Sequence, residues 1–309
     1  MGNTLKKFEF FMQLPPELMI AVLKNCDFQQ CYNVRLTCKY LYNLIEENQK
    51  SLALNEFFRI DLEKTSIRAW RKTSSTWWRE KCQIIPIEHI SNFFYFVNVK
   101  VLNVSALDEE TCAFLTEHAK NKNLRFEHLR LFHSLSASHE SICQLLKAAK
   151  CRRIHFRNVR SKLTLAHFEM EQFKNLESLW IERDDSIGEE FFDSILSVCN
   201  AKKFIFDNFG KLPQRFVREM FEKWLNGSRE LEAVRITTKL EFSIDEVFSG
   251  LSIRNVDRGT WSMKNAKGEE ATITACNDYS HFPYIYHFLV FNVNTHNVED
   301  TIYEFNYEP

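Results

Sequence analysis

The chain has 309 residues, with 40 basic and 41 acidic side chains, and 45% of its residues are hydrophobic. This composition is typical of a folded globular protein and excludes a collagen, a coiled coil and an intrinsically disordered chain. The net charge of −1 provides no overall attraction to nucleic acid or to an anionic membrane. With only 7 glycines, the sequence also lacks the glycine-rich phosphate-binding motifs of nucleotide enzymes.

The cysteines, histidines and serines of the sequence do not form a known catalytic or metal-binding motif. The nine cysteines are scattered without a CxxC pair, which favours reduced thiols in a cytoplasmic or nuclear protein. Cys276, His281 and His287 lack a fourth zinc ligand at useful spacing, and neither GxSxG nor HExxH occurs. The uncharged segment Tyr279–Val298 contains three histidines and a proline, so we expect no membrane span. We predict a protein that is not an enzyme and has no metal or cofactor.

Helical patterns dominate the first fifty residues. The sequence Leu14-Pro15-Pro16-Glu17 is typical of a helix start. Proline has no amide hydrogen, and the amides of the first turn have no hydrogen-bond partner within the helix, so proline is tolerated there. A second helix is expected from Asp27 to Thr37, and a third at Lys39–Glu47. Three short helices make a thin core, so we expect this domain to complete its burial against a partner.

Residues 51–98 are expected to form a helical connector that is rich in tryptophan and arginine. Its densest stretch has the sequence RAWRKTSSTWWRE. Tryptophan belts at membranes need neighbouring apolar spans, which this chain lacks. We therefore expect Trp70, Trp77 and Trp78 to pack the N-terminal helices onto the next domain.

A repeat of about 25 residues is the most informative pattern in the remaining chain. An apolar triplet at positions i, i+3 and i+5 recurs at intervals of 27, 25, 25, 25 and 30 residues. Segments with helical spacing lie between these triplets, as at 142–149, 192–199 and 217–224. The triplets are Val99/Leu102/Val104, Phe126/Leu129/Leu131, Cys151/Ile154/Phe156, Leu176/Leu179/Ile181, Ala201/Phe204/Phe206 and Leu231/Val234/Ile236.

Strands that alternate with helices at this period are typical of leucine-rich repeats, which stack into a parallel sheet. We therefore predict an α/β leucine-rich-repeat-like solenoid over residues 99–258. In the segment 259–309, strand patterns at 260–263 and 271–275 flank an Asn-Ala-Lys-Gly turn, and a further strand follows at 286–293. This segment is expected to be a β-hairpin cap of the same domain. The predicted fold class is α + α/β.

One face of the predicted sheet carries basic and aromatic side chains. Strand residues alternate between faces, so positions i+2, i+4 and i+6 point away from the helices. Arginines beside aromatic rings suit an acidic or phosphorylated peptide, because guanidinium groups form paired hydrogen bonds with such anions. A solvated face, or one covered by the C-terminal tail, is an equally good interpretation. The predicted substrate-binding residues are Arg130, Phe132, Arg153, His155, Arg157, Trp180, Lys203, Ile205 and Arg235.

The segment Lys147–Lys162 holds seven basic residues and no acidic one. The predicted periodicity distributes these charges over a helix end, a strand face and a loop rather than along one surface. We therefore expect no nucleic-acid partner for this segment.

The first fifty residues also carry the pattern of a known domain. Leu14–Leu18 forms an LP-x-E-L opening, Val22-Leu23 follows it, and Arg35–Ile45 contains an R-L-x-C-K-x-L-x-x-L-I run. This pattern resembles an F-box. Cys26 and Cys31 depart from it, since leucine is commoner at both positions.

The later part of the chain is similar to the F-box-associated domain of the F-box families that are expanded in nematodes. The matching residues are Phe221, Trp224-Leu225-Asn226-Gly227-Ser228, Leu231-Glu232, the turn Asn265–Gly268 and the strand Phe288-Leu289-Val290-Phe291. The resemblance thus predicts an F-box at residues 8–50 and an associated domain that extends to residue 309.

F-box proteins are substrate receptors of Skp/cullin/F-box ubiquitin ligases. The resemblance implies that the helices dock on a Skp-family adaptor, and through it on a cullin/RING core, while the C-terminal domain binds a protein substrate. A protein-interaction scaffold that uses the same repeat surface without ligase function is the alternative. For Leu41, burial in the core is as well supported as adaptor contact. The implied adaptor-binding residues are Leu14, Pro15, Leu18, Val22, Leu36, Cys38 and Leu41.

Overall fold

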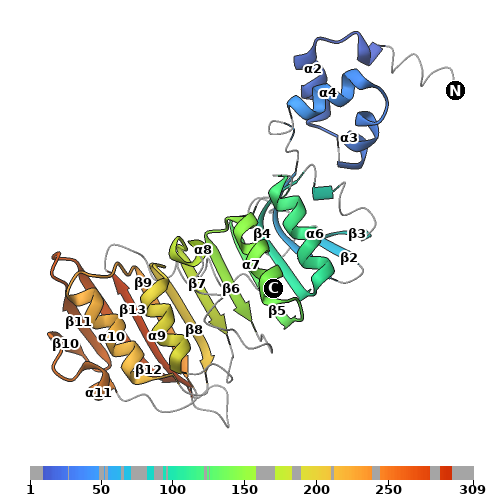
Figure 1. The fold of residues 1–309 in the computed structure, drawn as a ribbon. Coiled ribbons are helices and arrows are strands. Elements are labelled where there is room, and N and C mark those ends of the chain that lie inside the picture. Colours follow the sequence, from blue (N-terminus) through green and yellow to red (C-terminus); the bar gives the residue numbers. More distant parts are fainter. Residues whose placement is uncertain are drawn as a thin grey trace. The chain divides into compact units, whose positions relative to one another are not determined.

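A computed structural model shows a mixed α/β chain that divides into two compact units (Figure 1). The first unit comprises residues 1–105 and 110–127, and the second comprises 106–109 and 128–309. This boundary falls inside the segment 99–258 that the sequence assigns to one domain. The described residues are 10–26, 28–48, 52, 55–63, 66–70, 82–86, 93–94, 97–121, 124, 126–157, 171–182, 189–209, 212–238, 244–278 and 286–293.

Short helices form the N-terminal part of the first unit. They are α2 (Pro16–Leu23), α3 (Phe28–Arg35) and α4 (Lys39–Glu47). Pro15 precedes α2 with an extended backbone and Pro16 begins the helix, as the sequence predicts. Met19, Leu41 and Leu44 form a buried cluster, so α2 and α4 are held together by a small apolar core.

Residues 51–98 contain strands, so the predicted helical connector is wrong. β1 (Asn55–Leu62) pairs antiparallel with β2 (Ser66–Trp70), and β2 pairs antiparallel with β3 (Cys82–Pro86). On its other side, β1 pairs in parallel with β4 (Val97–Leu107). These residues form strands because buried side chains alternate with more exposed ones along the segment, which is the two-residue period of a strand. The buried residues are Ile60, Leu62, Ile67, Ala69 and Ile85.

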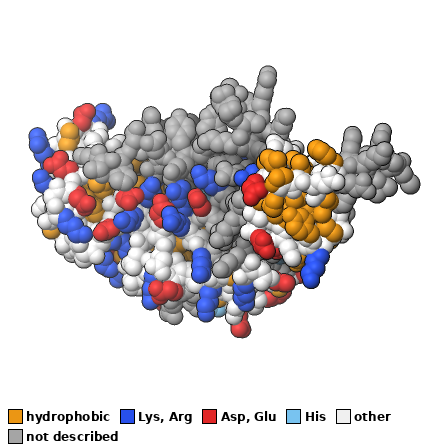
Figure 2. Space-filling model, turned by 90° about the horizontal axis from the view of Figure 1, so that it is seen from above, with side chains coloured by type: hydrophobic (Ala, Val, Ile, Leu, Met, Phe, Trp, Pro, Cys, Tyr) orange, Lys and Arg blue, Asp and Glu red, His pale blue; other side chains and the backbone are white. Residues whose placement is uncertain are grey.

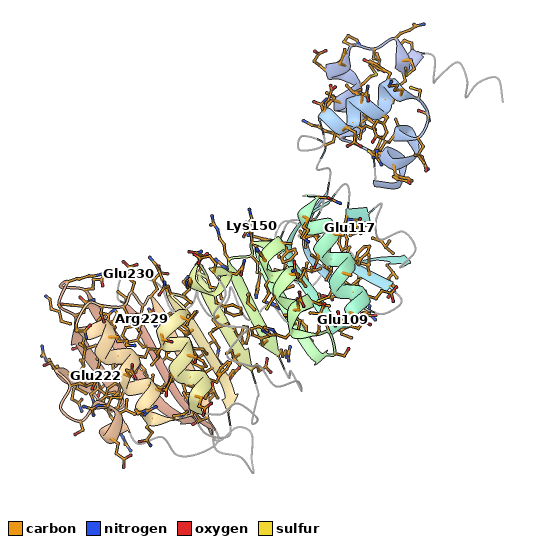
Figure 3. All side chains as sticks on the ribbon, viewed as in Figure 1. Glu109, Glu117, Lys150, Glu222, Arg229 and Glu230 are labelled. Carbon is orange, nitrogen blue, oxygen red and sulfur yellow. The ribbon has the colours of Figure 1, made fainter. Side chains whose placement is uncertain are left out.

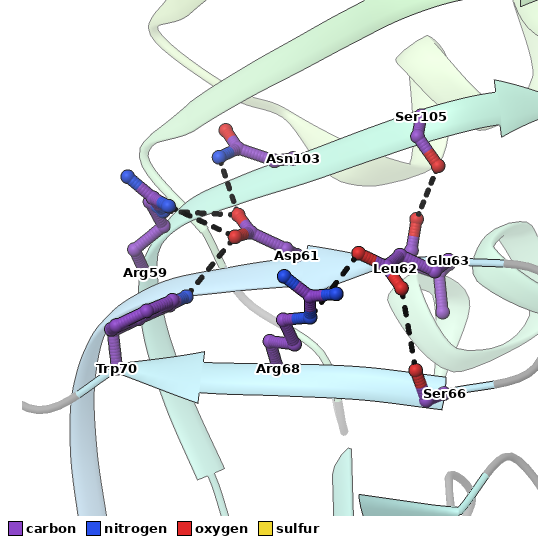
Figure 4. A network of polar contacts seen from close by, with 9 residues as sticks. All are labelled: Arg59, Asp61, Leu62, Glu63, Ser66, Arg68, Trp70, Asn103 and Ser105. Carbon is purple, nitrogen blue, oxygen red and sulfur yellow. Dashed lines mark hydrogen bonds and ion pairs between the residues drawn. The ribbon is translucent and has the colours of Figure 1, made fainter. Parts of the chain in front are cut away.

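Asp61 on β1 organises the polar contacts of these strands (Figure 4). Its carboxylate accepts two hydrogen bonds from Arg59 at 3.0 Å and one from Trp70 Nε1 at 3.0 Å. Asn103 Nδ2 donates a further hydrogen bond at 2.6 Å. Trp70 therefore bonds within its own sheet, and the packing role predicted for residues 77–78 lies outside the described part of the chain.

Parallel strands dominate the second unit. They are β5 (His128–Leu135), β6 (Arg153–Arg157), β7 (Ser178–Glu182), β8 (Lys203–Phe209) and β9 (Ala233–Thr238), and each pairs in parallel with the next. Their register aligns the apolar triplets, since Leu129 faces Ile154, Ile154 faces Leu179, and Leu179 faces Phe204. The parallel pairing predicted from the repeat is confirmed for these strands.

The helices of the second unit lie on one side of its sheet (Figure 1). They are α7 (His139–Ala149), α8 (Glu171–Lys174), α9 (Glu189–Val198), α10 (Gln214–Leu225) and α11 (Ile244–Phe248). Helix α6 (Glu109–Lys120) belongs largely to the first unit. Phe206 of β8 lies 6.1 Å from Phe192 of α9 and 5.3 Å from Phe216 of α10, between ring centroids. The triplet residues therefore form the core against the helices.

Arg229, labelled in Figure 3, caps the C-terminal end of α9. Its guanidinium donates hydrogen bonds to the carbonyl oxygens of Leu196 and Cys199 and lies over the ring of Phe204, 5.0 Å from the centroid. The last carbonyls of a helix have no partner within it, and a cation there is also favoured by the helix dipole. A residue that follows α10 thus stabilises the end of α9.

The last four strands extend the sheet beyond β9. They are β13 (Tyr286–Val293), β12 (Glu270–Asp278), β11 (Thr260–Lys264) and β10 (Ile253–Asp257), in that order from β9 and all antiparallel. The predicted hairpin is confirmed, with Gly268 at φ +85° in its turn. The antiparallel region begins with β10, upstream of the predicted boundary at residue 259.

Gly259, in the turn between β10 and β11, cannot be replaced without strain. Its φ is +74°, and a Cβ atom there would lie 2.7 Å from the carbonyl oxygen of Ala275. A left-handed backbone conformation by itself costs an alanine roughly 1–2 kcal/mol. We expect Gly259→Ala to destabilise the second unit by more than this, because the Cβ atom also clashes with a carbonyl oxygen. Gly250→Ala is the matched control, because Gly250 has the same φ with no atom within 4 Å. Equal urea midpoints for the two variants would contradict this.

Candidate functional site

Exposed apolar side chains are concentrated on the N-terminal helices. Among the described residues, eight large hydrophobic side chains are exposed, and six of them lie between residues 10 and 42. Figure 2 shows hydrophobic side chains gathered on the face of this helical region that is turned towards the viewer. The six residues are Phe10, Leu18, Val22, Leu36, Tyr40 and Tyr42. Such a concentration on a small domain is typical of a protein-interaction surface.

Helix α2 has apolar residues on two faces. Met19 and Leu23 are buried, whereas Leu18 and Val22 are 52% and 44% exposed. Each pair is spaced by four residues and forms one stripe along the helix. The domain's own core uses only one of the two stripes, which leaves the other for a partner.

The predicted adaptor-binding residues fall into three groups. Pro15, Leu18, Val22 and Leu36 are exposed, and Leu14 and Cys38 are half-buried against the core cluster. Leu41 is 0% exposed and lies with Met19 and Leu44 in that cluster. Of its two predicted roles, the structure therefore favours the core residue over the adaptor contact.

Phe10, Tyr40 and Tyr42 belong to the exposed surface but were missed by the sequence analysis. For the tyrosines a signal existed, because they lie off the apolar face of α4 that Leu41 and Leu44 define. Aromatic residues are enriched at protein interfaces relative to the rest of the surface.

Arg35 fixes the relative position of α3 and α4. Its guanidinium forms an ion pair with Glu46 at 2.6 Å and lies over the ring of Tyr42, 4.7 Å from the centroid. Both charged side chains are largely shielded from water, with exposed fractions of 16% and 31%. The exposed apolar residues of α2 and α4 are thus carried by a pre-ordered set of helices.

The second candidate surface is the basic sheet face, which we define as the nine predicted substrate-binding residues on β5 to β9. The predicted columns form as expected: Arg130 faces His155, His155 faces Trp180, Trp180 faces Ile205, and Ile205 faces Arg235. In the neighbouring column, Phe132 faces Arg157.

The centre of the basic sheet face is buried, so it is not the open surface that a substrate would reach directly. Exposed fractions are 4% for Arg130, 1% for His155, 8% for Trp180 and 5% for Ile205. The rings of His155 and Trp180 stack with a centroid distance of 3.8 Å and an interplanar angle of 4°. The rim residues are half-buried, and they are Phe132, Arg153, Arg157, Lys203 and Arg235.

Rim cations of the basic sheet face form ion pairs with nearby carboxylates. The pairs are Arg153–Glu177 at 3.2 Å, Arg157–Glu182 at 3.0 Å and Lys203–Glu232 at 3.8 Å. The column Arg130–His155–Trp180–Ile205–Arg235 itself contains no acidic residue.

His155 of the basic sheet face and the neighbouring His128, whose ring centroids are 6.4 Å apart, are held in their neutral form. Burial, and then the positive charge of Arg130, lowers the pKa of His128 well below its usual value. The pKa of His155 is lowered well below its usual value by the same two causes, burial first. Glu182 Oε2 lies 3.5 Å from His155 Nε2, which favours the protonated form, but the loss of hydration outweighs it.

These lowered pKa values predict that stability falls in acid. Below about pH 6.5 the unfolded chain protonates His128 and His155 while the folded chain does not, so each histidine removes up to about 1.4 kcal/mol per pH unit. We expect urea unfolding at pH 7.5 and 5.5 to show this loss, and a His128→Gln/His155→Gln variant to show less of it. Exposed His139, replaced by glutamine, is the control. A double variant that retains the full pH dependence would exclude this origin.

Neither a metal-binding cluster nor a membrane-spanning helix is found in the part of the chain that the structure describes. They contain no group of three or more histidine, cysteine, aspartate or glutamate side chains that could hold a metal ion. Within the same part of the chain, no helix is both long and apolar enough to cross a bilayer.

Comparison with known protein families finds a match to the F-box domain over residues 11–50. No curated protein matches the chain. The matched segment contains α2, α3, α4 and all but Phe10 of the six exposed apolar residues. An F-box implies a Skp-family partner in an SCF-type ubiquitin ligase. The N-terminal helices of this chain are an F-box domain.

Proposed function

We propose that this protein is the substrate receptor of a Skp/cullin/F-box ubiquitin ligase. Its F-box docks on a Skp-family adaptor and through it on a cullin/RING core, and its C-terminal domain binds a protein substrate. The protein performs no chemistry and uses no cofactor. It contributes by tethering the substrate near the ligase, which converts a bimolecular encounter into an intramolecular one.

The observation that carries the proposal is the exposed apolar surface of the F-box. Leu18, Val22 and Leu36 are 52%, 44% and 63% exposed, although burial of such side chains contributes roughly 1.5–3 kcal/mol each. A domain this small gains much of its stability by burying such residues against a partner. Pro15 is also exposed, and Leu14 and Cys38 are half-buried against the core cluster.

For the C-terminal domain, we propose a leucine-rich-repeat-like solenoid of the F-box-associated type found in the nematode-expanded families. The in-register triplets of β5 to β9 support this assignment. Its substrate is an acidic or phosphorylated segment that pairs with the basic sheet face. The half-buried rim residues Arg153, Arg157 and Lys203 are the first that such a segment would meet.

The proposed partners are proteins only, without nucleic acid or membrane, and the proposed location is the cytoplasm or the nucleus. The near-neutral charge supports the first statement, and the nine cysteines without a CxxC pair support the second.

Co-purification tests this function. Purified protein is mixed with a Skp-family adaptor and a cullin, and we expect both to be captured. A Leu14→Ala/Pro15→Ala variant with an unchanged thermal melt should capture less of both. Capture of the adaptor without the cullin would favour the scaffold alternative, and capture of neither would overturn the proposal.

A further inference from the structure

The sequence contains a single Asn-Gly pair, Asn226-Gly227, and it lies in the turn that ends α10. Asn226 is the C-cap residue of the helix, with φ −81° and ψ 0°, and Gly227 follows in the left-handed region at φ +75°. Glycine has no Cβ atom, so a neighbouring group can approach its backbone nitrogen closely. The turn therefore places an asparagine side chain beside an unhindered backbone amide.

The side-chain amide of Asn226 is held and polarised by the residue after the glycine. Its Oδ1 atom accepts a hydrogen bond from the backbone N–H of Ser228 at 2.9 Å. A donor at this oxygen makes Cγ more electrophilic and stabilises the negative charge that develops on Oδ1 when a nucleophile attacks Cγ. The Ser228 hydroxyl donates to the carbonyl oxygen of Lys223 at 3.1 Å, which holds Ser228 in this position.

We propose that Asn226 is a site of spontaneous deamidation through a succinimide. Hydroxide removes the N–H proton of Gly227, and the amide nitrogen attacks Cγ of Asn226. A new C–N bond closes the succinimide ring, and the side-chain nitrogen leaves as ammonia. Water then opens the ring at one of its two carbonyls, which leaves either aspartate or isoaspartate. One water is consumed and one ammonia is released, and no atom is oxidised or reduced.

One hydrogen bond restrains this reaction. The N–H of Gly227 donates to the carbonyl oxygen of Trp224 at 3.0 Å, and this bond must open before the nitrogen can attack. It belongs to the end of α10, and helix ends fray more readily than helix interiors. Asn226 and Ser228 are exposed, so water and hydroxide reach the turn. The fold thus slows the reaction without preventing it.

Either product changes the end of α10. A carboxylate replaces a neutral amide at the C-terminus of a helix, where the helix dipole disfavours negative charge. Isoaspartate also lengthens the backbone by one methylene group shortly before Arg229, whose guanidinium caps α9 through the carbonyl oxygens of Leu196 and Cys199. The N–H of Ala266 donates to the carbonyl oxygen of Leu225, at 2.8 Å, beside the same turn. Deamidation should therefore loosen the ends of both helices.

Peptide mapping of the full-length protein tests this inference. Purified protein is incubated in warm, mildly alkaline buffer. Mass spectrometry measures deamidation at each asparagine, and a protein-isoaspartate methyltransferase assay measures isoaspartate. Exposed Asn200 and Asn255 are references in the same molecule, because alanine and valine follow them. We expect Asn226 to react at least about tenfold faster than either, because a Cβ atom on the following residue hinders the attacking nitrogen.

Two matched variants separate this site from the rest of the chain. Asn226→Gln should remove most of the isoaspartate signal, because glutamine would have to close a larger and less favourable ring, whereas Asn200→Gln should retain the signal. Equal rates at Asn226 and at the two reference asparagines, or a full signal in Asn226→Gln, would overturn the inference.

Hydrogen exchange of the incubated protein tests the structural consequence. Peptides that cover the ends of α9 and α10 should exchange faster as isoaspartate accumulates, and the same peptides of incubated Asn226→Gln should not. Unchanged exchange in a fully deamidated sample would overturn the proposed loosening of the two helices. Adaptor capture tests the proposed function separately, since residues 226–229 lie outside the F-box.

Discussion

Replacing Leu18 and Leu36 with aspartate should abolish capture of the Skp-family adaptor. Both side chains are exposed, at 52% and 63%, and neither belongs to the core cluster of the F-box. In the complex each would lose the free energy of apolar burial, and each aspartate would add a desolvation penalty. We expect affinity to fall by about three orders of magnitude, measured by titration calorimetry with purified adaptor.

The control for this variant uses the other two exposed hydrophobic residues among those described. Ile84 and Val256 are 68% and 60% exposed and lie on β3 and β10, outside the F-box. Ile84→Asp/Val256→Asp introduces the same charges at similar exposure, so it should bind the adaptor like the wild type. If both double variants lost binding equally, the apolar surface of the F-box would not be the docking site.

Leu41→Ala should unfold or strongly loosen the F-box, with a loss of about 3 kcal/mol. Leu41 is 0% exposed and packs with Met19 and Leu44, so its truncation leaves a cavity that the short helices cannot fill without shifting. Hydrogen exchange in peptides that cover α2 and α4 measures this loss directly. The exchange of β5 to β9 should stay unchanged, because these strands belong to the second unit.

Leu36→Ala provides the matched comparison, because the same atoms are removed from a side chain that is 63% exposed. Its exchange should match the wild type within about 0.5 kcal/mol, while its adaptor affinity falls. This result would identify Leu41 as a core residue and Leu36 as an interface residue. An exchange rate for Leu41→Ala equal to that of Leu36→Ala would contradict this assignment.

Several elements follow directly from short windows of sequence. The proline pair at the start of α2, the span of α4 and the hairpin around Gly268 all match their predicted positions. The alignment of Ile154 with Leu179 follows from the 25-residue interval. These features depend on local backbone preferences and on hydrophobic periodicity, which neighbouring residues determine.

The strands of residues 51–98 are not evident from composition. The segment is rich in tryptophan and arginine, but its Ile60 and Leu62 alternate with polar residues, which is a strand pattern. Strand β1 is then stabilised by β4, about forty residues later in the chain. Such a non-local partner has no local signal in the sequence.

The sequence by itself determined the helix starts of the F-box, the register of β5 to β9 and the F-box pattern. Only the tertiary structure decided which apolar side chains the F-box buries, and that the centre of the basic sheet face is closed to water. Leu36 and Leu41 are the same residue type in one short segment, yet their exposed fractions are 63% and 0%. Exposure depends on contacts between residues that are distant along the chain, whereas periodicity depends on neighbours.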